Sequence, residues 1–161
     1  MLQPSDKAPD FELPLLTGGS WRLSDALQKG SVLLVFFKIS CETCHLTFPY
    51  LQRLVDAGQS GAPQLLAVSQ DNAEDTQYFH DEFKTSMPTL LEDPATWNVS
   101  NSYGIANVPT FFLIGADGVI ERSFEGFFRP DLESLAELFG VNLFGPGDSV
   151  PMLKPGCMSK N

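Results

Sequence analysis

Cys41 and Cys44 are the residues of this sequence whose type and spacing are best suited to chemistry. They stand in the run Cys41-Glu42-Thr43-Cys44, directly after an apolar segment. The thiolate is the nucleophilic form of cysteine, and a helix N-terminus lowers the thiol pKa because its free N–H groups and dipole favour the anion. A second thiol one helical turn further on can displace the first from a mixed disulfide. The position of the pair, more than its spacing, therefore predicts disulfide exchange, with Cys41 as an exposed attacking thiol and Cys44 as the resolving thiol.

The elements around this pair must place it at the junction of a buried strand and a helix. Residues 32–37 are apolar without alternation, which is typical of a central parallel strand. A helix is expected after Cys41, with an apolar side that runs to Val55. Further strands are predicted at 11–13, 21–23, 64–68, 89–91, 110–114 and 119–124, and further helices at 24–30, 71–83, 95–103 and 130–139.

This order of elements predicts an α/β fold with a central mixed sheet flanked by helices and an N-terminal hairpin. Residues 110–114 and 119–124, on either side of Ala116-Asp117-Gly118, form the clearest hairpin pattern. The segment 141–161 contains Pro146, Pro151 and Pro155 and shows no periodicity. We therefore expect one domain over residues 1–140 and a C-terminal tail over 141–161.

Composition limits the classes of partner. The 161 residues carry a net charge of −10 with a pI near 4.4, which argues against binding nucleic acid or an anionic membrane surface. No apolar run approaches the ~20 residues that cross a bilayer. The first residues show no secretory signal, so we expect a cytoplasmic protein, or an extracytoplasmic one if the chain is a mature or trimmed form. No metal or organic cofactor is expected, because the two sulfurs carry the electrons.

Several motifs together resemble the thioredoxin superfamily, and within it the TlpA-like and redoxin (AhpC-TSA-like) thiol–disulfide oxidoreductases. The resemblance covers residues 9–140 and is carried by Ala8-Pro9-Asp10-Phe11, the dithiol, Pro49 in the following helix, Asn107-Val108-Pro109-Thr110 and residues 114–118. It implies a thioredoxin-like fold with an inserted helix–strand–helix segment between the dithiol and Pro109. It also implies that Pro109 is cis and faces the dithiol, and that Val108 and Pro109 bind the substrate through the backbone. The implied partners are a protein or small-molecule disulfide and an unidentified thiol reductant.

Residues near the dithiol depart from the family pattern. Ser40 stands where the family has tryptophan, and Val35 stands where thioredoxin has a buried aspartate that accepts a proton from the second thiol. Glu42 beside the active thiol should oppose thiolate formation, which Lys38 could offset. We therefore predict a modestly reducing protein with a less acidic Cys41. The remaining possible modulators are Thr43 and His45, and for His45 the simpler expectation is a solvated or capping side chain.

Other chemistries fit parts of the pattern. Cys41 to His45 matches the attachment motif of c-type haem, although the chain has only one other histidine, His80. A structural zinc site needs four ligands, and few remain here. A peroxiredoxin would need Pro-x-x-x-Thr-x-x-Cys, whereas Leu34 and Lys38 occupy those positions before Cys41. An inert buried pair of cysteines and a non-enzymatic thioredoxin-fold binding module stay open as alternatives.

Cys157 is the third cysteine and lies in the tail, within Lys154-Pro155-Gly156-Cys157. We expect it to be exposed on a flexible segment. It is either a bystander or an auxiliary thiol that pairs with Cys41 or with another chain.

Overall fold

A five-stranded mixed sheet organises the chain, and the computed structural model describes all residues, 1–161. The strand order is β5 (Thr89–Leu91), β4 (Gln64–Ser69), β3 (Val32–Phe37), β7 (Thr110–Ile114) and β8 (Ile120–Glu125). β3 runs parallel to β4 and antiparallel to β7, and β7 and β8 form the expected antiparallel pair. The predicted mixed α/β sheet is confirmed.

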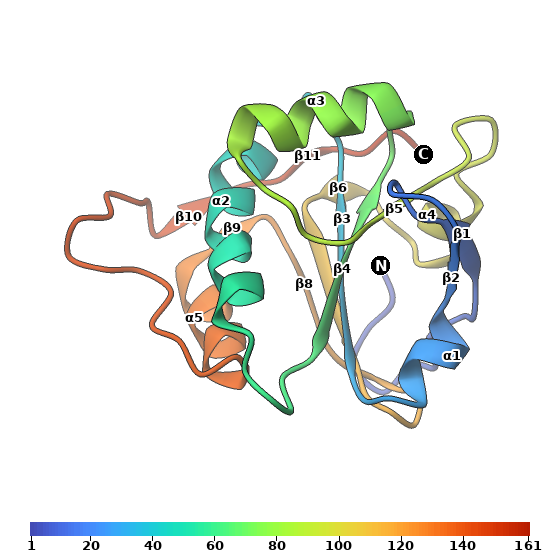
Figure 1. Cartoon of the computed structure of the whole chain (residues 1–161), viewed down its shortest axis with the longest axis horizontal. Coiled ribbons are helices and arrows are strands. Elements are labelled where there is room, and N and C mark those ends of the chain that lie inside the picture. Colours follow the sequence, from blue (N-terminus) through green and yellow to red (C-terminus); the bar gives the residue numbers. More distant parts are fainter.

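The other elements cover both faces of this sheet (Figure 1). The helices α2 (Glu42–Ala57) and α5 (Arg129–Leu138) lie on one face. The hairpin of β1 (Glu12–Pro14) and β2 (Ser20–Arg22), with α1 (Leu23–Leu27) and α4 (Asn98–Ser102), lies on the other. The remaining helix, α3 (Ala73–Phe83), packs beside α2 at one end of the sheet, so the inserted helix–strand–helix consists of α3, β5 and α4.

An aromatic cluster fixes the start of α2 against the end of β3. All six residues of β3 are fully buried, as the unbroken apolar run predicts. The ring of Phe37 lies 4.3 Å from that of Phe48 in α2 and 5.0 Å from that of Phe79 in α3. Burying a side chain of this size stabilises the fold by ~1.5–3 kcal/mol. The loop that joins β3 to α2 is therefore held between two packed elements.

The helix expected over residues 95–103 is shorter in the structure and covers Asn98–Ser102. Asp93 accepts hydrogen bonds from the N–H groups of Ala95 and Trp97, which form a turn before the helix. Trp97 then adopts a left-handed conformation with φ of 45°, so regular helix begins only after it.

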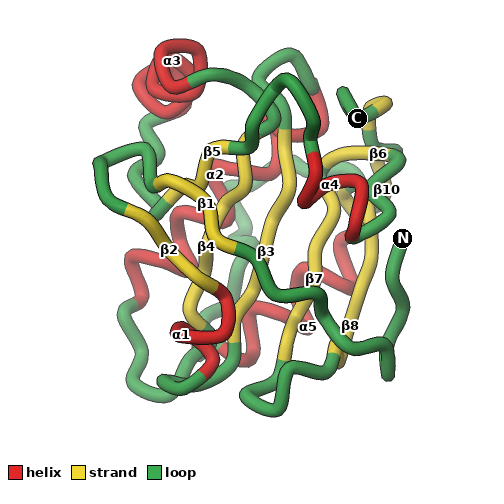
Figure 2. Tube along the Cα trace, turned by 90° about the vertical axis from the view of Figure 1, so that its right-hand side faces the viewer, coloured by secondary structure: helices red, strands yellow, loops and turns green.

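The tail 141–161 differs from the expected loop. β10 (Leu153–Lys154) pairs with β9 (Phe127–Phe128), and β11 (Cys157–Met158) pairs with β6 (Asn107–Val108). Figure 2 shows the C-terminus beside β6, at the same end of the sheet as α3. Cys157 is half-buried, so the expectation of an exposed thiol was wrong. Among the helices of this fold, none has the combined length and apolarity that a membrane span requires.

Candidate active site

Cys41 is the N-terminal capping residue of α2. Its backbone is extended, and its sulfur accepts a hydrogen bond from the backbone N–H of Cys44 at 3.2 Å. A sulfur in this position occupies the place of the side-chain oxygen that usually caps a helix. The two cysteines therefore meet at the helix N-terminus, where free N–H groups stabilise a negative charge.

The Val108–Pro109 bond is cis and lies beside this sulfur. The sulfur of Cys41 lies 3.3 Å from the carbonyl oxygen of Val108, to which it donates a hydrogen bond in its protonated form. Sheet register brings these distant residues together, because Phe36 at the end of β3 pairs with Thr110 at the start of β7. The dithiol and the proline loop are thus carried by the adjacent central strands β3 and β7, at one end of the sheet.

Both thiols of the pair are enclosed, and the expectation that Cys41 is exposed was wrong. Cys41 and Cys44 are each 0% exposed. The C-terminal segment contributes to the cover. Cys157 pairs with Val108 in the antiparallel register, and the hydroxyl of Thr43 donates to the carbonyl oxygen of Pro155 at 2.6 Å. All three cysteines are free thiols in this structure.

The two thiols have opposite acidities. Hydrogen bonding from the thiol of Cys44 lowers the pKa of Cys41 from 9.0 to about 6, assisted by the thiol and backbone N–H of Cys157 and opposed by burial. Burial raises the pKa of Cys44 well above its ordinary value, and the neighbouring Cys41 raises it further. Cys41 is therefore the thiolate of the pair at neutral pH, and Cys44 stays protonated.

The Glu42 carboxylate, which we expected to make Cys41 less acidic, points into solvent. The side chain of Glu42 is 82% exposed and lies 3.8 Å from the ammonium group of Lys154 in the tail. Water and this cation screen its charge. Lys38 acts here through its backbone, which accepts a hydrogen bond from the N–H of Cys41 at 3.3 Å.

Comparison with known proteins agrees with this geometry. The model of the AhpC/TSA family matches residues 4–123. The chain belongs to the AhpC/TSA family. It is 32% identical over 120 residues to the thiol-disulfide oxidoreductase ResA of Geobacillus thermodenitrificans. The aligned region covers 74% of this chain and 67% of that protein. ResA of Geobacillus kaustophilus is 31% identical over 128 residues, covering 78% and 72%.

Solved structures place this AhpC/TSA-family chain among thioredoxin-like folds. A putative thiol:disulfide interchange protein DsbE from Chlorobium tepidum superposes with a TM-score of 0.75 at 30% identity, covering 89% of this chain and all of that one. The peroxidoxin BcpB of Mycobacterium tuberculosis shares the fold with a TM-score of 0.71 at 22% identity, covering 89% and 97%. The fold is thus common to both chemistries, whereas the similar sequences and the Cys-x-x-Cys pair identify this family member as a thiol–disulfide oxidoreductase.

His45 has a structural role in this AhpC/TSA-family chain, and of the solvated or capping side chain expected, the solvated form is not found. Its Nε2 lies 2.6 Å from the carbonyl oxygen of Ile39, and its ring stacks on Phe83 with centroids 4.6 Å apart. The imidazole thereby ties the loop before Cys41 to α2 and α3. With Nε2 engaged by the backbone, His45 is not positioned as an axial ligand of a haem.

The sequence interpretation missed the tail residues that contact the two residues between the cysteines and the Val108 backbone. Pro155 bonds to Thr43, Lys154 faces Glu42, and Gly156 lies so close that an added Cβ would be 2.7 Å from the oxygen of Val108. No local pattern marks this segment as part of a site. Val35 is fully buried between β4 and β7, so it leaves Cys44 without the carboxylate that thioredoxin places there.

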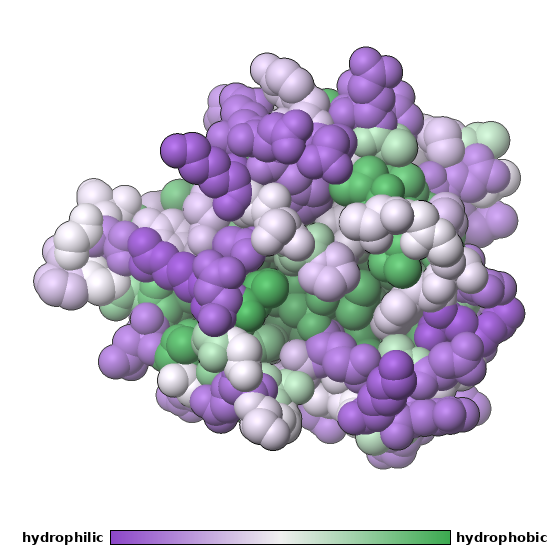
Figure 3. Space-filling model, viewed as in Figure 1, coloured by the Kyte–Doolittle hydropathy of each residue, from purple (hydrophilic) through white to green (hydrophobic).

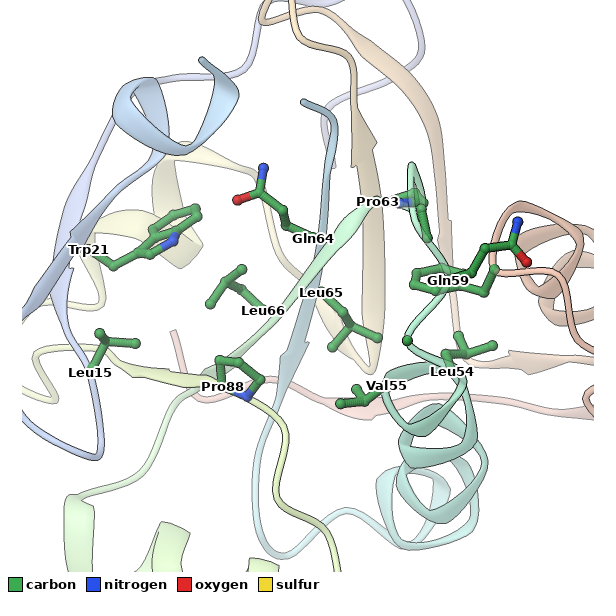
Figure 4. Close-up of a pocket in the computed structure, with 13 residues that line it drawn as sticks. Leu15, Trp21, Leu54, Val55, Gln59, Pro63, Gln64, Leu65, Leu66 and Pro88 are labelled. Atoms are coloured by element: carbon green, nitrogen blue, oxygen red, sulfur yellow. The ribbon is translucent and has the colours of Figure 1, made fainter. Parts of the chain in front are cut away.

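An apolar groove of about 440 Å³ lies apart from the dithiol. Its lining includes Leu15 and Trp21 from the hairpin, Leu66 from β4 and Val55 from the end of α2 (Figure 4). Figure 3 shows hydrophobic residues exposed across the middle of this face, surrounded by hydrophilic ones. No lining residue belongs to the Cys-x-x-Cys motif or to the Val108–Pro109 loop.

Proposed function

We propose that Cys41 attacks the substrate disulfide, that Cys44 resolves the resulting mixed disulfide, and that Val108 and Pro109 dock the substrate. The single observation that carries this assignment is the placement of Cys41. Its sulfur caps α2 and lies 3.3 Å from the Val108 carbonyl, and hydrogen bonding from Cys44 lowers its pKa to about 6. A thiolate at that position meets any disulfide bound along the Val108–Pro109 backbone.

The reaction proceeds in two exchanges. The Cys41 thiolate attacks one sulfur of the substrate disulfide, a Cys41–substrate bond forms, and the other substrate sulfur leaves as a thiolate that takes up a proton. Cys44 then loses its proton and attacks the Cys41 sulfur, which releases the second substrate thiolate. The products are a reduced substrate and a Cys41–Cys44 disulfide, which an external thiol reductant converts back to the dithiol.

The acidity of Cys44 changes during this cycle. The negative charge of Cys41 is one reason that the pKa of Cys44 is high, after burial and the hydrogen bond between the two sulfurs. That charge is lost once Cys41 enters the mixed disulfide, so Cys44 becomes easier to deprotonate when it must act. This change favours deprotonation of Cys44, a step that in thioredoxin is assisted by a buried aspartate at the position of Val35.

The proposed substrate is a disulfide in an extended protein segment, with small disulfides as weaker substrates. The free backbone edge of a short strand binds an extended chain by main-chain hydrogen bonds. Val108 is the last residue of the short strand β6, whose edge β11 covers in this structure and which a substrate segment would take over once β11 separates. The cytoplasmic location stays a prediction. Thiol trapping in cells, which measures the redox state of the chain in each compartment, would test it.

The test is turnover of insulin disulfides with dithiothreitol as the reductant, beside a parallel assay of hydrogen peroxide consumption. We expect catalysed insulin reduction by the wild-type chain and its loss in Cys41→Ser, with circular dichroism to verify folding. The double variant Cys44→Ser, Cys157→Ser, which has no second thiol to displace the substrate, should retain the first exchange and accumulate a mixed disulfide. Retained insulin turnover in Cys41→Ser, or peroxide consumption that exceeds insulin reduction, would overturn the proposal in favour of another thiol or of the peroxidase alternative.

A further inference from the structure

The C-terminal strand occupies the backbone edge to which the substrate is proposed to bind. β6 has one partner strand, β11, and Cys157 stands opposite Val108 in that pair. Ser159 extends the pairing by donating from its N–H to the carbonyl of Ala106 at 3.0 Å. Figure 1 shows the red C-terminal segment leaving α5 and crossing the end of the molecule where α3 lies. The tail thus makes the main-chain contacts that a docked disulfide-containing segment would make.

Cys157 is the residue that this strand brings to the dithiol. Cys157 stands opposite Val108, whose carbonyl oxygen lies 3.3 Å from the Cys41 sulfur, and the thiol and backbone N–H of Cys157 help to lower the pKa of Cys41. Cys41 therefore has two thiol neighbours, Cys44 from α2 and the half-buried Cys157 from the tail.

Contacts on both sides of Cys157 hold the strand in register. Before it, Pro155 accepts from Thr43 at 2.6 Å, and Gly156 fits against β6 so tightly that its lack of a Cβ is required. After it, the Lys160 ammonium pairs with the buried carboxylate of Asp71, and the Lys160 N–H donates to Gln70 at 2.9 Å. An ion pair with a carboxylate that is 3% exposed is screened far less than a surface pair. These contacts would not form if the tail were a passive, mobile extension.

We propose that Cys157 is a third redox-active thiol of this chain, which β11 delivers as an intramolecular substrate that forms a disulfide with Cys41. The inference rests on the proposed roles of Cys41 and Val108. In the exchange, the Cys157 thiolate attacks the Cys41 sulfur of the Cys41–Cys44 disulfide. A Cys41–Cys157 bond forms, the Cys41–Cys44 bond breaks, and Cys44 takes up the proton that Cys157 released, with no net oxidation.

This arrangement makes the tail and an external substrate competitors. While β11 pairs with β6, the main chain of Val108 is occupied and Cys41 is covered. Substrate entry therefore requires β11 to separate from β6, and a Cys41–Cys157 disulfide would lock the site shut until Cys44 or an external thiol attacked it. The dithiol would then be shielded from adventitious oxidation and would respond to disulfides able to displace the tail.

The test uses full-length Cys44→Ser, equilibrated at low protein concentration in glutathione redox buffers. Cys41 attacks glutathione disulfide to give Cys41–glutathione and one glutathione, and Cys157 then displaces the second glutathione to close Cys41–Cys157. Non-reducing mass mapping should find the monomeric Cys41–Cys157 crosslink as the main oxidised species. The control Cys44→Ser, Cys157→Ser should stop at Cys41–glutathione.

A second pair of variants tests whether the pairing of β11 with β6 is what allows the Cys41–Cys157 crosslink to close. Gly156→Ala in the Cys44→Ser background places a methyl group against the Val108 oxygen, which should reduce the equilibrium constant for closing the crosslink by about tenfold or more. Gly147→Ala, which changes an open position in the same tail, should leave that constant within about twofold. The proposal is overturned if Cys44→Ser accumulates Cys41–glutathione with Cys157 free, or if Gly156→Ala crosslinks as readily as Gly147→Ala.

The two proposals fail differently. Insulin reduction that depends on Cys41, without a Cys41–Cys157 crosslink, would leave the proposed function standing and remove the role of Cys157. Insulin reduction that persists in Cys41→Ser would remove the proposed function itself, whatever the crosslinking result.

Discussion

Replacing Cys44 by alanine tests the physical origin of the reactive thiolate. The pKa of Cys41 is lowered from 9.0 to about 6, a difference of roughly 3 units, and the thiol of Cys44 is the largest cause. At ~1.36 kcal/mol per unit, the surroundings favour the thiolate by roughly 4 kcal/mol after the cost of burial. A hydrogen bond to a charged group contributes ~1.5–3 kcal/mol, which corresponds to roughly 1–2 pKa units. Cys44→Ala should therefore raise the pKa of Cys41 to roughly 7–8.

The assay is a pH titration of the β-carbon NMR shift of Cys41, which reports this one thiol without requiring a reagent to enter the covered site. The thiolate fraction at pH 7 should fall from about 90% in the wild-type chain to between ~50% and ~10% in Cys44→Ala. Cys44→Ser is the matched control, because its hydroxyl keeps a donor at that position and should leave the pKa nearer that of the wild type. A Cys41 pKa that stays within about half a unit of 6 in Cys44→Ala would refute the reasoning.

Three further predictions follow from the same geometry. The reduction potential of the Cys41–Cys44 couple should fall by ~59 mV per pH unit below pH about 6 and by ~30 mV per pH unit above it. The slope changes because reduction takes up two protons below the pKa of Cys41 and one proton above it. Redox titration at several pH values would show an unchanged slope if Cys41 were an ordinary thiol. The reduced protein should gain stability against unfolding, relative to Cys41→Ser, as the pH rises from about 6 towards ~8.5. The reason is that the pKa of Cys41 is lower in the folded than in the unfolded state, so the gain is lost as the pH falls through about 6. Denaturant titrations across this window should show no such trend if the pKa of Cys41 is not lowered. Thr43→Val removes the 2.6 Å hydrogen bond to Pro155 and should speed iodoacetamide labelling of Cys41 by ~2–10-fold. This range corresponds to a loss of ~0.5–1.5 kcal/mol in the free energy with which the tail docks. Equal labelling rates would mean that this hydrogen bond does not hold the tail.

The sequence was sufficient for the elements that place the dithiol. β3, α2 and the β7–β8 hairpin follow from local patterns, namely an unbroken apolar run, helical periodicity and a turn with Gly118. These signals lie within one element or between neighbours in the chain, so they survive in any tertiary context. The short α4 was harder to place, because a turn built on the Asp93 side chain competes with the helix over the same residues.

The surroundings of the thiols could not be predicted in the same way. Nothing in the sequence around Cys157 indicates that it pairs with Val108, because the partner strand β6 has only two residues and no alternating pattern. The exposure and acidity of Cys41 both depend on this long-range contact and on Glu42 turning towards solvent and Lys154. A carboxylate adjacent in sequence was expected to dominate the pKa, but hydrogen-bond donors in direct contact with the sulfur have the larger effect.

The central claim, that Cys41 is the thiol that attacks substrate, is tested most directly by trapping the first covalent intermediate. Reduced wild-type protein would be mixed with a limiting disulfide-containing peptide, quenched with acid before one turnover is complete, and mapped by mass spectrometry under non-reducing conditions. The account predicts that the earliest mixed disulfide joins the peptide to Cys41. A first adduct on Cys44 or on Cys157 would contradict it.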